Sequence, residues 1–223
     1  DVDGALPWWF SFLVSTIAAE RLEMTRLTRR GPEVEPLLWN IMAMMLGGAA
    51  LAPVSWTLGR ALFGLSLVAL AAWLLAFDIA RRTVLADGLG RYMAVCLLTG
   101  YGWLAVSGAA WVAMTAGLPT RDAALHALGL GFVVSMMMAH APVILPALTR
   151  VKVRFGAFFY VPLALLNLSL VIRLFLGHAD LRVRGLGAVM NAVALGTFAA
   201  TILGGAVRWR MMDHQRKTQH KAG

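Results

Sequence analysis

The chain has 223 residues, of which 60% are hydrophobic and only 14% are charged, and its formal net charge is +9. A soluble domain carries nearer one quarter charged residues, so this composition excludes an ordinary soluble protein and indicates a polytopic membrane protein. The positive charges fall between hydrophobic runs, where they set topology and meet anionic lipid, and this placement argues against a nucleic-acid partner.

Hydrophobic runs long enough to cross a bilayer recur along the whole chain. About 20 apolar residues suffice for a helical span, whereas barrel strands would alternate every second residue. We therefore expect an all-α polytopic membrane protein, a single integral membrane domain built as a bundle of seven transmembrane helices. Their expected ranges are 6–23, 36–56, 61–82, 92–116, 122–149, 155–177 and 186–207, with a basic cytoplasmic tail over 208–223.

Lys and Arg residues are divided unevenly between the two sets of alternate loops. The set that begins after the first segment, including the tail, holds fifteen of them, and the opposite set holds four. Cytoplasmic loops carry the excess of Lys and Arg. We therefore expect the N-terminus outside and the C-terminus in the cytoplasm, in a bacterial inner membrane.

The segment 122–149 stands apart because it carries histidines at depths where an imidazole is costly and usually functional. His126 and His140 would lie within about 40° of each other on one face of an unbroken α-helix, roughly 21 Å apart along its axis. A neighbouring face repeats small residues at four-residue spacing, which lets another helix approach closely. These residues are Ala123, Ala127, Gly131, Ser135 and Ala139.

The expected topology brings His126 and His178 to compatible levels near the outer surface, on consecutive helices. Two imidazoles from adjacent helices are what a low-spin haem needs as axial ligands, and Gly129 would leave space for a porphyrin edge. Arg173 either binds a haem propionate or extends its charge outward to water. Asp180 is a candidate acceptor for the second ring nitrogen at this outer site. The alternatives are that His178 is a loop histidine and that His126 bonds only to backbone or water.

His140 lies at the inner level, directly after three methionines. Met136 is one turn away on the same side, and thioether and imidazole ligands together suit copper, particularly Cu(I). The alternative is that the methionines simply fill the apolar core. Pro142 is expected to bend the helix beside this histidine, because it removes a backbone hydrogen bond.

Charged residues at the helix ends are expected to pair locally. Asp78 precedes two arginines by three and four positions, the spacing of an ion pair on one helix face. Glu20, with Arg21 beside it, either pairs with the basic loops or feeds protons inward. Tyr101 is expected to form an interhelical hydrogen bond.

Three runs of the sequence, TIAAERLEM, HALGLGFVV and MAHAPVILPAL, resemble a known family, the NnrS-type haem- and copper-containing membrane proteins. That family is associated with the bacterial response to nitric oxide. The resemblance covers most of the chain, although members are usually longer. It implies that His126 and His140 make the haem or copper contacts. The run HAPVILPAL departs from the family, which would have an Arg and a Gly-His-Thr-Gly stretch there.

These features predict a membrane protein that binds haem b, with copper as a further candidate, and acts in nitric oxide response or respiratory redox metabolism. The cofactor would supply the redox chemistry, and the protein would supply ligation and burial. A different class stays open, a cofactor-free integral membrane subunit or assembly factor of a larger complex. The expected partners are the lipid bilayer and other membrane subunits or a redox partner. No catalytic residue is assigned, and whether the chain is an enzyme is left open.

Overall fold

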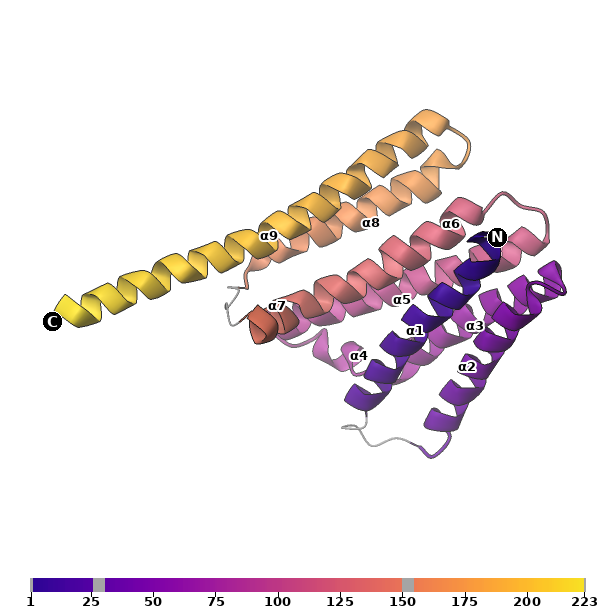
Figure 1. Cartoon of the computed structure of the whole chain (residues 1–223), viewed down its shortest axis with the longest axis horizontal. Coiled ribbons are helices and arrows are strands. Elements are labelled where there is room, and N and C mark those ends of the chain that lie inside the picture. Colours follow the sequence, from indigo (N-terminus) through magenta and orange to yellow (C-terminus); the bar gives the residue numbers. More distant parts are fainter. Residues whose placement is uncertain (1, 26–30, 150–154, 223) are drawn as a thin grey trace. The chain divides into compact units, whose positions relative to one another are not determined.

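The computed structural model describes residues 2–25, 31–149 and 155–222, and over these ranges every regular element is helical (Figure 1). The predicted all-α fold is therefore confirmed. The long helices are α1 (Val2–Thr25), α2 (Val34–Leu51), α3 (Trp56–Phe77), α5 (Gly88–Thr115), α7 (Ser135–Thr149), α8 (Tyr160–Leu174) and α9 (Leu181–Ala222). The short elements are α4 (Ala80–Thr83), α6 (Arg121–His126), the π-helical segment η1 (Ala127–Val134) and the 3-10 turns η2 (Ala157–Phe159) and η3 (Leu176–His178).

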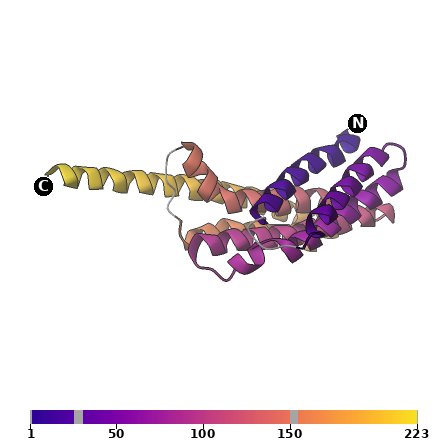
Figure 2. The same cartoon turned by 90° about the horizontal axis from the view of Figure 1, so that it is seen from below.

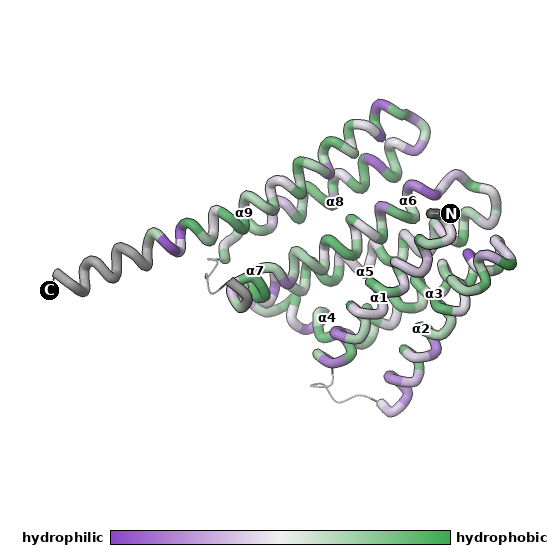
Figure 3. Tube along the Cα trace, viewed as in Figure 1, coloured by the Kyte–Doolittle hydropathy of each residue, from purple (hydrophilic) through white to green (hydrophobic). Residues whose placement is uncertain are grey.

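Six helical stretches within the described ranges are long and apolar enough to cross a membrane. Figure 3 shows hydrophobic residues along the helices and hydrophilic ones gathered near their ends. The chain is therefore a multi-pass membrane protein. These stretches coincide with the second to seventh expected segments, and α1 is not among them. They are Val34–Leu51, Trp56–Phe77, Gly88–Thr115, Arg121–Ala147, Ala157–Leu174 and Leu181–Met211.

The chain divides into two compact units, each of which is described by itself. Unit 1 comprises Asp1–Thr83 and Leu97–Val134, and unit 2 comprises Val84–Cys96 and Ser135–Gly223. The division passes through α5 and between η1 and α7. Whether the two units form the single integral domain expected from the sequence stays a prediction.

Glycines bring the helix backbones of unit 1 close together. A Cβ atom at Gly48 of α2 would lie 2.5 Å from the backbone nitrogen of Phe63 in α3. One at Gly64 of α3 would lie 2.7 Å from the carbonyl oxygen of Gly108 in α5. The ring of Phe63 also meets that of Trp111 edge-on at 5.1 Å. Close backbone approach at small residues is how membrane helices associate, because lipid supplies no hydrophobic drive between them.

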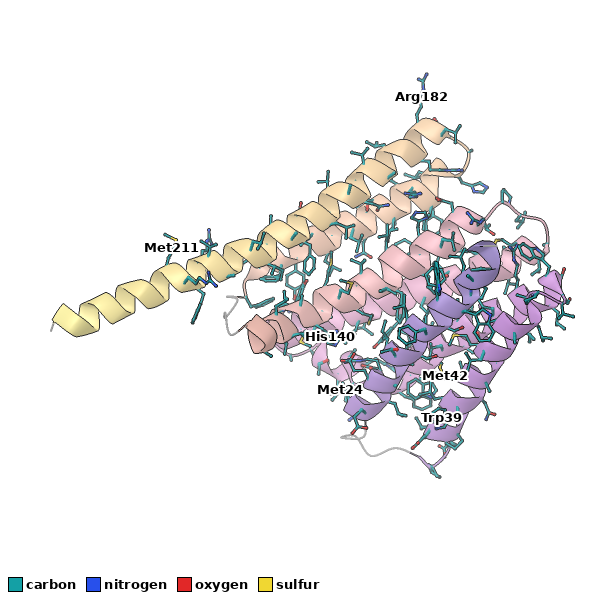
Figure 4. The ribbon with its side chains drawn as sticks, in the orientation of Figure 1. Met24, Trp39, Met42, His140, Arg182 and Met211 are labelled. Carbon is teal, nitrogen blue, oxygen red and sulfur yellow. The ribbon has the colours of Figure 1, made fainter. Side chains whose placement is uncertain are left out.

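One face of α1 is packed within unit 1. Ser11, Val14, Ala18 and Arg21 are buried, and steps of three and four residues place them along one side of a helix. The Ser15 hydroxyl contacts the sulfur of Met42, which is labelled on α2 in Figure 4, at 3.6 Å. The first segment thus lies alongside the longer apolar helices of its unit.

Helices α8 and α9 form an antiparallel hairpin in unit 2, and both views show α9 continuing past α8 (Figures 1 and 2). Gly187 permits their contact, because a Cβ there would lie 2.6 Å from the Cβ of Arg173. Helix α9 has 42 residues, about 63 Å at 1.5 Å per residue. That length is about twice the hydrocarbon core of a bilayer. The helix of the seventh expected segment therefore continues past residue 207 into the basic tail, and the expected end of the membrane span at residue 207 stays a prediction.

Candidate functional site

His126 is the last residue of α6 and its ring is held by Asp122, one turn earlier. Its Nδ1 lies 2.9 Å from the Asp122 carbonyl oxygen and 3.1 Å from Asp122 Oδ1. A backbone carbonyl can only accept a hydrogen bond, so Nδ1 carries the proton and donates it. In the neutral ring the lone pair is therefore on Nε2. The imidazole is 30% exposed, so a ligand has access to this side chain.

Asp122 thus occupies the position that the acceptor of a metal-bound imidazole takes, since such a ring donates its other N–H to a carboxylate or a carbonyl. Asp122 was not predicted from the sequence, where Asp180 is the candidate acceptor for the outer site. Asp180 Oδ1 instead accepts the backbone N–H of Arg182 at 2.7 Å, at the start of α9. The signal that could have identified Asp122 was its four-residue spacing from His126.

The π-helical segment η1 follows His126 directly. Such segments are rare and occur frequently at functional sites. Within η1, a Cβ atom at Gly129 would meet nothing within 4 Å, so the space beside this glycine is open. Hydrogen bonds from i to i+5 also widen each turn, so the rotation about the helix axis per residue is smaller than in an α-helix. The predicted common face of His126 and His140 requires an unbroken α-helix and is therefore wrong, because η1 lies between the two histidines.

Helix α5 fixes the position of the His126 turn. The Ser107 hydroxyl donates to the Ala124 carbonyl at 2.7 Å, and in return the Thr120 hydroxyl donates to the Ala110 carbonyl at 2.7 Å. The small-residue stripe of the sequence is a packing face, as predicted, because four of its five members are buried. These are Ala127, Gly131, Ser135 and Ala139.

Replacing Gly131 by Leu should lower the stability of the protein. A Cβ atom at this position would already lie 2.5 Å from the Cβ of Trp103 on α5, so the larger side chain must push the helices apart, at a cost of about 1–3 kcal/mol. Thermal melting of the purified protein measures the effect. Gly129→Ala is a control and should melt no lower than the wild type, because its methyl group enters open space and Ala favours a helix more than Gly does. An unchanged Gly131→Leu melting curve would contradict this packing.

His140 lies on α7 in unit 2, where Figure 4 labels it. Its Nδ1 donates to the Met136 carbonyl at 2.7 Å, so by the same argument Nε2 holds the lone pair of the neutral ring. Met136 is buried, and the contact shown here is through its backbone. The described ranges contain no group of three or more His, Cys, Asp or Glu residues placed to hold a metal. Copper ligation by His140 and the Met136 thioether therefore stays a prediction.

His178 ends the turn η3 in unit 2, and its side chain is exposed. Arg184 donates to its carbonyl oxygen at 3.0 Å. Arg173 lies in the last turn of α8 in the same unit. His126 and Gly129 belong to unit 1, so the pairing of His126 with His178 and the role of Arg173 at a propionate both stay predictions.

A buried polar cluster in unit 1 was not predicted. Arg21, Asp78 and Tyr101 are 4%, 4% and 0% exposed, and they come from α1, the end of α3 and α5. The Tyr101 hydroxyl interacts with both Asp78 and Arg21, although neither that hydroxyl nor Asp78 Oδ2 makes a fully formed hydrogen bond. Arg21 also pairs with Glu20 at 3.0 Å. Intramembrane ionisable groups of this kind usually pair with one another.

The predicted ion pair of Asp78 with the two arginines after it is wrong. Helix α3 ends at Phe77, and Asp78 has an extended backbone with ψ 145°. Because the helix ends before Asp78, this residue and the two arginines do not share the helical spacing on which that prediction depended. Asp78 Oδ1 instead accepts the backbone N–H of Ala80 at 2.7 Å, which orients its carboxylate at the start of α4.

Comparison with known proteins gives one match. The model of a family described as "Domain of unknown function (DUF8744)" matches residues 1–207. No curated protein and no solved structure matches the chain. The family description names no activity and no cofactor, so the resemblance to NnrS-type proteins adds only an expectation. Because the match covers far more than half of its residues, the chain belongs to the DUF8744 family.

Proposed function

We propose that this protein binds haem b in the membrane, with Nε2 of His126 as an axial ligand. The observation that supports this most is the pair of contacts from Asp122 to Nδ1, at 2.9 and 3.1 Å. They fix the tautomer and the ring orientation that a metal-bound imidazole requires. The bound haem would supply redox chemistry, and the chain would orient and bury it.

Two features that follow His126 along the chain support a planar ligand at this place. The space next to Gly129 is open, and η1 gives the helix an irregular backbone of the kind found at functional sites. His178 is proposed as the second axial ligand and Arg173 as a propionate partner. His140 and Met136 are proposed as an inner site for copper or a second haem.

The proposed biological role is in nitric oxide response or respiratory redox metabolism in the bacterial inner membrane. It rests on the resemblance of three sequence runs to NnrS-type proteins. The direct test is the visible spectrum of the purified protein, expressed with ample haem and copper. A sharp low-spin reduced spectrum of the b type is expected. A colourless protein free of copper would instead favour a cofactor-free membrane subunit or assembly factor.

We also propose that α1 is a seventh span, with the N-terminus outside and the C-terminus in the cytoplasm. Its packed face supports this, because Ser11, Val14, Ala18 and Arg21 are buried within unit 1. The excess of fifteen Lys and Arg over four in alternate loops supports the orientation.

Reporter fusions should place alternate loops on opposite sides of the membrane. We expect a cytoplasmic signal after Arg30 and Arg82 and a periplasmic signal after Thr57, Pro119 and Ala179, because the basic loops stay inside. An alkaline phosphatase and green fluorescent protein pair measures both sides. A periplasmic signal after Arg30 would show that α1 does not span, and the seven-helix topology would then fail.

A further inference from the structure

Asp122 contacts the His126 ring through two oxygen atoms that differ in charge. One of its two acceptors is a neutral carbonyl oxygen, and the other is a carboxylate oxygen 3.1 Å from Nδ1. The carboxylate is only 29% exposed, so water screens its charge less than at an open surface. The pair lies within one turn of α6, which Ser107 holds against α5.

A carboxylate that accepts the Nδ1 proton raises the electron density of the whole imidazole. The donor strength of Nε2 rises with it, because a bonded carboxylate increases ligand basicity. A ligand that donates more electron density stabilises the more highly charged, ferric state of iron. Hydrogen bonding to axial ligands is one of the means by which a protein adjusts the potential of haem.

We infer that Asp122 sets the oxidation-state preference of iron bound at His126 and holds it towards the ferric form. This inference rests on the proposed function. A site with this preference has a low reduction potential, so its reduced form is a strong one-electron donor. The chemistry therefore suits delivery of electrons to an acceptor better than stable storage of reduced iron.

The test is a redox titration of the full-length protein loaded with haem b, in detergent or nanodiscs. Asp122→Asn keeps the size of the side chain and an oxygen that can accept the Nδ1 proton, but it removes the charge. Haem should stay bound, and the midpoint potential should rise. The affinity for ferric haem should fall about tenfold relative to that for ferrous haem, which is the lower end of the loss of metal affinity when such a hydrogen-bond partner is removed.

Two further variants separate the carboxylate contact from other effects. Asp122→Glu keeps the charge and should retain a potential near that of the wild type. If Asp122→Asn fails to fold, Asp122→Ala takes its place, because it removes the carboxylate while the backbone carbonyl still accepts the Nδ1 proton, and it should likewise raise the potential. Asp87→Asn is the matched control, because this exposed carboxylate lies outside the proposed site. It should leave the potential unchanged.

The outcomes distinguish this inference from the proposed function. A coloured protein whose potential is unchanged or lowered by Asp122→Asn would overturn the inference alone. An equal upward shift in Asp87→Asn would also overturn it, because the effect would then be one of general charge. A colourless wild-type protein would overturn the proposed function and this inference together.

Discussion

The low-spin haem spectrum of the purified protein is expected to disappear, or to convert to high spin, when His126 is replaced by Ala. Loss of the imidazole opens an axial position on the iron. Because Nδ1 donates to Asp122, Nε2 is the ring atom that can bind the iron, and His126→Ala removes it. The reduced-minus-oxidised visible spectrum and the ratio of haem to protein measure the effect.

The other histidines are the controls for this variant. His178→Ala should give the same loss if it is the second ligand of the same haem. His140→Ala should leave that spectrum nearly intact and remove only copper or a second haem. A His126→Gly protein in which free imidazole restores the spectrum would separate ligation from folding. Loss of haem only with His140 would move the site to the inner level, and equal loss in all three variants would indicate a folding effect.

The helical fold and the packing face of the segment 122–149 were predictable because each helix carries its own hydrophobic signal. The expected ranges 36–56 and 61–82 correspond to Val34–Leu51 and Trp56–Phe77. The small residues around Gly131 likewise mark a contact that Trp103 fills. These features depend on residue size and hydropathy at fixed spacing, which are properties of the sequence itself.

The geometry at His126 was less predictable. The π-helical register of η1 has no local sequence signal that we can name, and it accompanies contacts with Ser107 and Trp103 on another helix. The Asp122 pair did have a signal, its four-residue spacing, but the choice between Asp122 and Asp180 needed the backbone at the start of α9. The buried cluster brings together α1, α3 and α5, which sequence spacing alone does not place side by side.

The largest loss of stability is expected from removing one charge of that buried cluster. Asp78 and the nearly fully buried Arg21 both interact with the Tyr101 hydroxyl. Asp78→Asn would remove the negative charge of this buried cluster and keep the positive one, and a buried charge that loses its compensation typically costs about 3–5 kcal/mol. We expect the lower end of this range, because Glu20 still pairs with Arg21 at 3.0 Å. Thermal or denaturant unfolding of the purified protein in detergent gives the value.

The double variant Arg21→Met with Asp78→Asn decides whether charge is the cause. It removes both charges from the apolar interior, so it should recover part of the stability that the single variant loses. Tyr101→Phe is the milder control and should stay within about 1 kcal/mol of the wild type, because its hydroxyl makes no fully formed hydrogen bond. A double variant no more stable than Asp78→Asn alone would show that Arg21 and Asp78 act independently, because the amide oxygen of Asn can still accept the Ala80 N–H and both variants keep that bond.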